Sequence, residues 1–347
     1  QMYLNDGFSV RIVDITNASE GHFNELLRID SDRRFDALVP LSKNLFIAAT
    51  ETMIRRFLEV GGRSFEGTTY SSAFDYHYKG ITSVCLYEEN YILTTGGDHS
   101  IKLLAIKSKE LKGTYKGHTH IVNQVAVLSK AKVVSVDQGG VALIWSPTNF
   151  STLQKLNNPA SRLALLPDLN MILADTAIEF YSLVENKYYN KFSFHTKPVR
   201  SLLVHDEIRL VSAADDLKIV VSMLKDGHVL STLQGHFAEI NKLVSINDDM
   251  IASGSLDHTI RIWSLSHGKC YNTLENDCGV YSVLKLSDDL LVSGDEKGAI
   301  KFWDLSNNEV VFKREKAHDR SINDMIKVDT LSFISVCNEA TINLWKS

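Results

Sequence analysis

The stretch GHFAEINKLVSINDDMIASGSLDHTIRIWSLSHGKCYNTLE, from Gly235 to Glu275, decides the fold. It contains four short runs that alternate in polarity and are rich in β-branched residues: INKLVSI, MIASGS, HTIRIWSL and KCYNTLE. A period of two residues favours β-strands over helices. The runs are separated by Asn-Asp-Asp, Leu-Asp-His and Ser-His-Gly, which consist largely of turn-forming residues. The stretch therefore predicts one antiparallel sheet of four strands.

Similar units recur along the chain with a period close to 41 residues. Two positions mark each unit: the inner anchor, at the start of the first strand, and the outer anchor, late in the third strand. The inner anchors are Phe35, Ile81, Val122, Ser161, Val199, Ile240, Val280 and Ile322. The outer anchors are Phe57, Leu104, Trp145, Tyr181, Ser222, Trp263, Trp303 and Trp345. Both series have eight members, so the sequence predicts eight units of one kind.

One such sheet cannot bury both of its faces by itself. Sheets that stack radially around an axis bury them and leave only short, protected edges. The sequence therefore predicts an all-β fold, an eight-bladed β-propeller with four-stranded antiparallel blades. No Pro- or Ser-rich linker divides the chain, so we expect a single propeller domain over residues 1–347.

Closure of the ring needs one more strand. The last unit, ATINLWKS, provides only a third strand, and we expect HFNELLRI at residues 22–29 to complete the last blade. This pairing would join the first and last blades and remove an open edge. The run SVRIVDI at residues 9–15 looks like a further third strand, so residues 1–21 hold an extra strand of uncertain placement.

Short motifs at the ends of the units identify a family resemblance. A Gly-His pair opens two units and a Trp-Asp pair closes a third, at Gly117-His118, Gly235-His236 and Trp303-Asp304. These units resemble WD repeats, and the resemblance covers residues 22–347. In that family a His, a Ser or Thr, an Asp and a Trp form a buried hydrogen-bonded chain. The resemblance implies such a structural tetrad at His236, Ser253, Asp257 and Trp263.

The other units keep only parts of the tetrad. Partial sets stand at His77, Thr94 and Asp98, at His195, Ser212 and Asp216, and at His318, Ser335 and Trp345, with Glu339 in place of Asp. The unit that ends at Trp145 has Gly139 at the Asp position. The unit that ends at Trp303 has Asn276 for the His and Lys297 for the Asp.

Composition and charge exclude several classes of protein. The formal net charge is -5 with a pI near 6.2, whereas nucleic-acid binders usually carry a basic excess, so we expect no nucleic-acid partner. No apolar run approaches the roughly 18 residues of a membrane span, and no signal-peptide pattern opens the chain. The four cysteines share no disulfide or zinc spacing. We therefore expect a cytoplasmic or nuclear protein without membrane insertion.

Recurring His, Ser and Asp residues invite a hydrolase interpretation. However, five of the twelve histidines occupy one position of the repeat, whereas a catalytic triad occurs once in a domain. No glycine-rich phosphate loop and no metal-ligand spacing is present. We therefore predict a structural role for these residues, with no catalytic residue, no metal and no cofactor.

Residues next to the inner anchors should project onto the narrow face around the central channel. We predict that this top face binds partners, through Arg34, Asn123, Arg162, Arg200, Asn241, Tyr281 and Asn323. Arg and Tyr are favoured at interfaces, so Arg162, Arg200 and Tyr281 are the strongest candidates.

The resemblance implies a protein–protein interaction module: a scaffold or substrate-recognition platform that binds a protein or peptide within a larger complex. One alternative is a phosphopeptide-reading receptor of a ubiquitin ligase, which the top-face arginines suggest. A second alternative is an enzyme on a propeller scaffold, but the acidic residues near the channel are scattered over several units.

Overall fold

The computed structural model describes residues 77–347 except 107, 109, 157–158, 167–169, 330–331, 339–340 and 347, together with seven strand backbones between residues 2 and 70. By contacts, the chain divides into two compact units. One comprises residues 1–69 and 344–347, and the other comprises residues 70–343. Among the described residues, no helix has the length and apolar character needed to cross a membrane.

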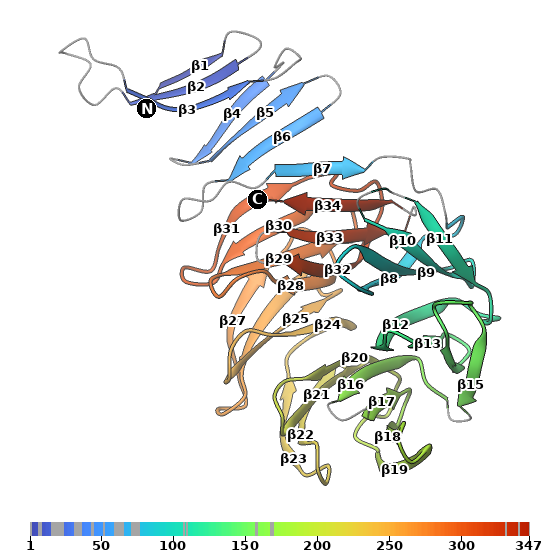
Figure 1. The fold of residues 1–347 in the computed structure, drawn as a ribbon. Coiled ribbons are helices and arrows are strands. Elements are labelled where there is room, and N and C mark those ends of the chain that lie inside the picture. Colours follow the sequence, from blue (N-terminus) through green and yellow to red (C-terminus); the bar gives the residue numbers. More distant parts are fainter. Residues whose placement is uncertain are drawn as a thin grey trace. The chain divides into compact units, whose positions relative to one another are not determined.

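Seven four-stranded sheets, blades 1 to 7, make up the ring (Figure 1). Blades 1 and 2 contain β8 (Ile81–Leu86), β9 (Tyr91–Gly96), β10 (Ile101–Ala105), β11 (Leu111–Tyr115), β12 (Val122–Ser129), β13 (Lys132–Asp137), β14 (Ala142–Trp145) and β15 (Thr152–Leu156). Blades 3 and 4 contain β16 (Arg162–Leu166), β17 (Asn170–Ala174), β18 (Ile178–Ser182), β19 (Lys187–Phe192), β20 (Val199–Val204), β21 (Arg209–Ala214), β22 (Lys218–Met223) and β23 (Val229–Gln234). Blades 5 and 6 contain β24 (Ile240–Ser245), β25 (Met250–Ser255), β26 (Thr259–Ser264), β27 (Lys269–Glu275), β28 (Val280–Lys285), β29 (Leu290–Asp295), β30 (Ile300–Asp304) and β31 (Glu309–Arg314).

Blade 7 combines strands from distant parts of the sequence. It contains β32 (Ile322–Asp329), β33 (Ser332–Cys337) and β34 (Ile342–Lys346), and its fourth strand is β7 (Glu66–Tyr70), which pairs with β34. The first strands of the blades contact one another in the closed cycle β8, β12, β16, β20, β24, β28, β32 and back to β8. The ring is therefore complete with seven blades.

The predicted count of eight blades is wrong. The first repeat unit forms a separate three-stranded sheet of β4 (Ala37–Ser42), β5 (Leu45–Thr50) and β6 (Met53–Leu58). The next strand in sequence, β7, follows β6 where the fourth strand of that unit is expected. It pairs with β34 and closes blade 7 instead. Because the unit gives its fourth strand to another sheet, counting repeats overestimates the blades by one.

The prediction that residues 22–29 close the ring is also wrong. An N-terminal segment does complete the last blade, but that segment is β7. Residues 22–29 overlap β3 (Asn24–Asp30), which pairs with β2 (Ser9–Asp14). Together with β1 (Met2–Asn5) these strands form a second three-stranded sheet. The extra strand predicted at residues 9–15 is β2, the central strand of that sheet.

Both anchor series lie where the ring packs. Six inner anchors of the seven blades are buried, and Ser161 in blade 3 is half-buried. All seven outer anchors are buried, including the small Ser222. Apolar clusters join each pair of consecutive blades from blade 1 to blade 6. One such cluster joins Val211 and Val221 of blade 4 to Ile240 and Trp263 of blade 5.

The closing strand gives a direct test of the seven-bladed ring. A chain that starts at Gly61 keeps β7, whereas a chain that starts at Ser72 leaves β34 with an unpaired edge. We expect the shorter chain to melt at a clearly lower temperature and to aggregate more readily. Equal melting temperatures for the two truncated chains would show that β7 does not close the ring.

Candidate functional site

The residue after each inner anchor, the post-anchor residue, has a distinctive backbone position. In six blades the pairing of the first and second strands shifts register here, so that this residue is the extra one of a β-bulge. The bulged residues are Thr82, Asn123, Arg200, Asn241, Tyr281 and Asn323. In blade 3 the pairing is regular, and Arg162 is opposite Ala174. Bulges re-aim side chains, which explains how a repeated sequence position can point at the channel.

All seven post-anchor residues line one central cavity of about 130 Å³. The structure thus brings together six of the predicted partner-binding residues: Asn123, Arg162, Arg200, Asn241, Tyr281 and Asn323. The seventh, Arg34, lies outside the described residues.

Five post-anchor side chains fasten their blade to the next one. The amide nitrogens of Asn123, Asn241 and Asn323 donate to the carbonyl oxygens of the next inner anchors, at 3.4, 3.2 and 2.6 Å respectively. The Thr82 hydroxyl makes the same link to the next anchor carbonyl. In blade 3, Arg162 Nε donates to the carbonyl oxygen of Arg200 at 2.6 Å. These side chains therefore serve the ring itself.

Arg200 and Tyr281 depart from this pattern. Arg200 donates Nε and Nη2 to the two carboxylate oxygens of Asp215, at 2.6 and 3.1 Å, within its own blade. Its side chain is 41% exposed, so this bidentate pair is accessible from outside. Among the described residues, no side-chain hydrogen bond is found for Tyr281. The ring therefore leaves these two post-anchor side chains free of any link between blades.

Residues two positions after the inner anchor form a second circle of links, which the sequence analysis missed. Gln124 accepts a hydrogen bond from the backbone N–H of Leu163 at 3.0 Å. Ser201 accepts one from the N–H of Leu243, also at 3.0 Å. The sequence signal for these links was a polar residue two positions after the inner anchor. Leu163 shows that an apolar residue also fits at this position, so a polar residue there indicates a specific contact.

Asp324 of blade 7 is the most connected member of this circle. Its Oδ2 accepts from the Ser83 hydroxyl at 2.9 Å and from the backbone N–H of Val84 at 3.2 Å, both in blade 1. Its Oδ1 accepts from Lys242 Nζ of blade 5 at 2.8 Å. The carboxylate is nearly buried, at 9% exposed, whereas the Lys242 side chain is 35% exposed. Asp324 therefore joins three blades at the cavity.

The cavity perturbs the pKa values of its ionisable groups. Burial lowers the pKa of Arg162 to about 10, and the positive charge of Arg200 acts in the same direction. The hydrogen bond to Asp215 raises the pKa of Arg200. Burial raises the pKa of Tyr281, and the negative charge of Glu296 adds to the effect. Both arginines remain cationic and Tyr281 neutral at pH 7.

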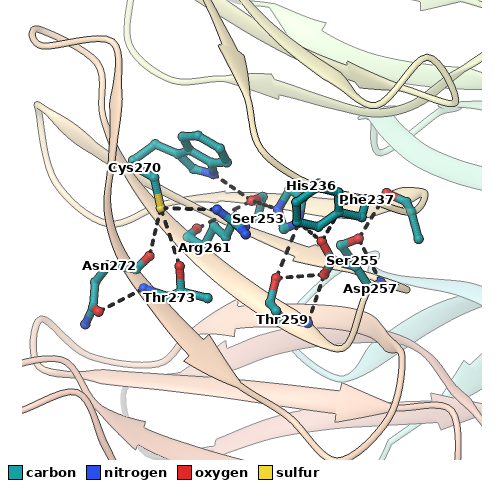
Figure 2. Close-up of polar contacts among 12 residues, drawn as sticks. His236, Phe237, Ser253, Ser255, Asp257, Thr259, Arg261, Cys270, Asn272 and Thr273 are labelled. Carbon is teal, nitrogen blue, oxygen red and sulfur yellow. Dashed lines mark hydrogen bonds and ion pairs between the residues drawn. The ribbon is translucent and has the colours of Figure 1, made fainter.

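The tetrad of blade 5 connects the loop that enters the blade to β25, to β26 and to the turn between them (Figure 2). His236 Nδ1 contacts Asp257 at 2.7 Å, and His236 Nε2 contacts the Ser253 hydroxyl at 2.6 Å. Trp263 Nε1 donates to the same hydroxyl at 2.7 Å. His236 Nδ1 donates to the Asp257 carboxylate, and the Ser253 hydroxyl, which accepts from Trp263 Nε1, can donate to His236 Nε2.

Two blades keep this carboxylate at another position in the sequence. In blade 2, where the motif has Gly139, Asp137 lies 2.9 Å from His118 Nδ1. In blade 6, where the motif has Lys297, Asp295 accepts from the backbone N–H groups of Lys297 and Ala299. The expectation that these blades lack the Asp was therefore wrong, because a carboxylate two residues earlier reaches the same loop.

Comparison with known proteins agrees with this geometry. The family model described as "WD domain, G-beta repeat" matches residues 227–264, which contain the tetrad of blade 5. The serine-threonine kinase receptor-associated protein of Homo sapiens is 27% identical over 192 residues, covering 53% of this chain and 54% of that protein. These matches and the ring of four-stranded blades together support a WD-repeat β-propeller.

Other relatives match shorter or more divergent stretches. The ribosome biogenesis protein YTM1 of Eremothecium gossypii is 24% identical over 194 residues, 51% of this chain and 43% of that protein. The mitochondrial division protein 1 of Neurospora crassa is 44% identical over 57 residues, 16% of this chain and 9% of that protein. The chain spans about half the length of the first curated relatives that it matches.

Within this WD-repeat ring, the repeated histidines are structural in their contacts. Each of the five contacts a Ser or Thr seventeen residues later, at 2.6–3.0 Å. Burial lowers the pKa of His118, His195 and His318, to about 3 in the case of His318. Among the described residues, no group of three or more His, Cys, Asp or Glu side chains could hold a metal ion.

The tetrad predicts an unequal cost for two histidine substitutions. His236→Ala should lower the free energy of unfolding by roughly 1–3 kcal/mol, because it strands the buried Ser253 hydroxyl and Asp257. His120→Ala should have little effect, because His120 is exposed and contacts only Thr119 by a side-chain hydrogen bond. Equal denaturation midpoints for the two variants would contradict a structural tetrad.

The buried histidines also predict a pH dependence. A folded-state pKa below the unfolded value of about 6.5 means that the unfolded chain binds more protons. Stability should therefore fall as the pH drops from 7 to 5, by up to about 1.4 kcal/mol per pH unit for each such histidine. Asp98, whose pKa is lowered to about 2, adds stability that is lost only as the pH falls below 3.8, so it does not change the slope between pH 7 and 5. Denaturation curves of His318→Gln should show a shallower dependence than the wild type, whereas His120→Gln should leave the slope unchanged.

The hydrogen bonds at the cavity predict that substituting Asp324 destabilises the protein more than substituting its ion-pair partner Lys242. Asp324→Ala removes a nearly buried acceptor of several hydrogen bonds and should cost roughly 1.5–3 kcal/mol. Lys242→Met removes a partly exposed cation and should cost less than about 1 kcal/mol. Chemical denaturation should therefore show a larger loss of unfolding free energy for Asp324→Ala than for Lys242→Met. A larger loss for Lys242→Met would show that Asp324 does not hold the blades together.

Proposed function

We propose that this propeller is a protein-interaction module whose partner binds at the mouth of the central cavity, centred on Arg200 and Tyr281. One observation carries the proposal. Five of the seven post-anchor side chains fasten adjacent blades, whereas these two do not. At this position the other side chains link adjacent blades. A side chain that makes no such link is a candidate for a second role, such as binding a partner.

The surroundings of these two residues suit an interface. Arg and Tyr are enriched among residues that dominate binding energy. Arg200 is held in place by its bidentate pair with Asp215, and the bulged strands beneath both residues are fixed by the ring. A rigid surface loses little conformational entropy on binding, so a few anchors can suffice. The remaining predicted contacts, at Asn123, Arg162, Asn241 and Asn323, would then form the wall of the site.

The relatives support the same class of function. The names of two relatives describe a protein associated with a receptor and a protein of ribosome biogenesis. We propose by analogy that this chain is a non-enzymatic subunit of a multiprotein complex, in the cytoplasm or nucleus. The absence of nucleic-acid binding and of membrane insertion remains a prediction from charge and hydropathy.

The proposal is tested by affinity capture from a cell extract. Arg200→Ala combined with Tyr281→Ala should weaken recovery of the partners at least about tenfold while leaving the melting temperature nearly unchanged, because neither side chain links two blades. Adding Arg162→Ala should weaken recovery further, at some cost in stability.

Tyr271→Ala is a matched control for this capture. This tyrosine is 69% exposed on β27, the fourth strand of blade 5. If Tyr271→Ala loses the partners and the Arg200/Tyr281 double variant keeps them, the binding surface lies on the outer strands and the proposal is wrong.

A further inference from the structure

The size of the central cavity limits what can enter it. Pockets for small molecules usually measure about 300–1,000 Å³, whereas this cavity measures about 130 Å³. Its wall consists mainly of amide, hydroxyl and charged side chains. The cavity therefore suits one polar side chain of a partner rather than a separate small-molecule ligand.

The charges of the cavity leave one cation without an ionic partner. Lys242 is paired with Asp324 at 2.8 Å, and Arg200 is paired with Asp215 at 2.6 Å. For Arg162, no carboxylate forms an ion pair among the described residues. Its Nε and Nη1 donate to the carbonyl oxygens of Arg200 and Ser161, which carry no net charge. Among the charged side chains that line the cavity, Arg162 is therefore the cation that no carboxylate pairs with.

We propose that the cavity receives the carboxylate of a single aspartate or glutamate side chain of the partner protein, which pairs with Arg162. This inference rests on the proposed function, because it names the partner group that the same site recognises. Arg162 is half-buried, so the pair would form in a partly desolvated site where charge-assisted hydrogen bonds are strong. The Asn123 and Asn241 amides in the same wall supply polar surroundings for the second carboxylate oxygen.

The charge balance favours a carboxylate over a phosphate. A carboxylate matches the single unpaired arginine, whereas a phosphoserine carries a charge of about -1.5 to -2 and would be repelled more strongly by the nearby carboxylates. Glu239 and Glu296 increase this penalty, since both act on Tyr281 at the rim. Backbone hydrogen bonds hold both residues at the rim, from Leu256 N–H to the Glu239 carbonyl and from Glu296 N–H to the Gly279 carbonyl, each at 2.9 Å.

The test uses synthetic peptide pools and the whole chain. Each pool has random flanking positions, an acetylated N-terminus, an amidated C-terminus and one fixed central residue: Glu, Asp, Gln, Lys or phosphoserine. Binding to the immobilised protein is measured at low and high salt. We expect the Glu or Asp pool to bind at least about tenfold more than the Gln, Lys and phosphoserine pools, and to weaken as salt increases.

Variants then locate the contact. Arg162→Gln should abolish the preference for the acidic pool, and Arg162→Lys should keep part of it because the charge remains. Glu239→Gln is the control, which should retain or strengthen acidic binding. The comparison of Glu with Gln pools on the wild type needs no substitution, so it remains decisive even where an Arg162 variant is unstable.

Each other result overturns the inference. Equal binding of the Glu and Gln pools, stronger binding of the phosphoserine or Lys pool, or no binding of any pool excludes a carboxylate pocket. A preference that appears only when the pools carry a free C-terminus assigns the pocket to a chain terminus instead. Failure of the proposed function is seen separately, when the Arg200/Tyr281 double variant recovers every partner as well as the wild type.

Discussion

The hydrogen bond between a histidine and a Ser or Thr of the second strand recurs in five blades, at His77–Thr94, His118–Ser135, His195–Ser212, His236–Ser253 and His318–Ser335. Each bond attaches the loop that enters a blade to the middle of its sheet. In each of these blades the inner anchor lies four residues after this histidine, so the bond also helps to fix where the first strand begins. In these five blades the bulged post-anchor residue follows directly after that starting point.

The sequence was sufficient to predict the family, the four-stranded blades and six residues of the cavity wall, because these features repeat with the period of the chain. It was not sufficient for the number of blades. β7 follows β6 as a fourth strand should, and only its pairing with β34 reveals that it belongs to another sheet. Strand sequences carry little information about their partner when several similar edges are available. The carboxylates at Asp137 and Asp295 were missed for a related reason, since a shift of two residues breaks the motif while preserving the contact.

The post-anchor residues illustrate a second limit of reasoning from sequence. Their spacing predicted that they face the channel, and all seven do. Whether such a side chain is free depends on the next blade, about 40 residues away in sequence. Asn123 and Asn241 look like good surface donors, yet both donate to a neighbouring anchor carbonyl. Arg200 finds its carboxylate partner within its own blade instead.

A ring can release a side chain for binding only where other contacts hold the same interface. Between blades 4 and 5, where Arg200 makes no link, the Ser201 hydroxyl accepts from Leu243 N–H and the apolar cluster around Trp263 is buried. Between blades 6 and 7, where Tyr281 makes no link, Lys327 Nζ donates to the Leu286 carbonyl at 2.6 Å. Between blades 3 and 4 the position two after the anchor is the apolar Leu163, so the link there depends more heavily on Arg162. The arginine that no carboxylate pairs with is thus also one that its interface needs, because its hydrogen bond to the Arg200 carbonyl holds the side chain in place while its charge stays unpaired.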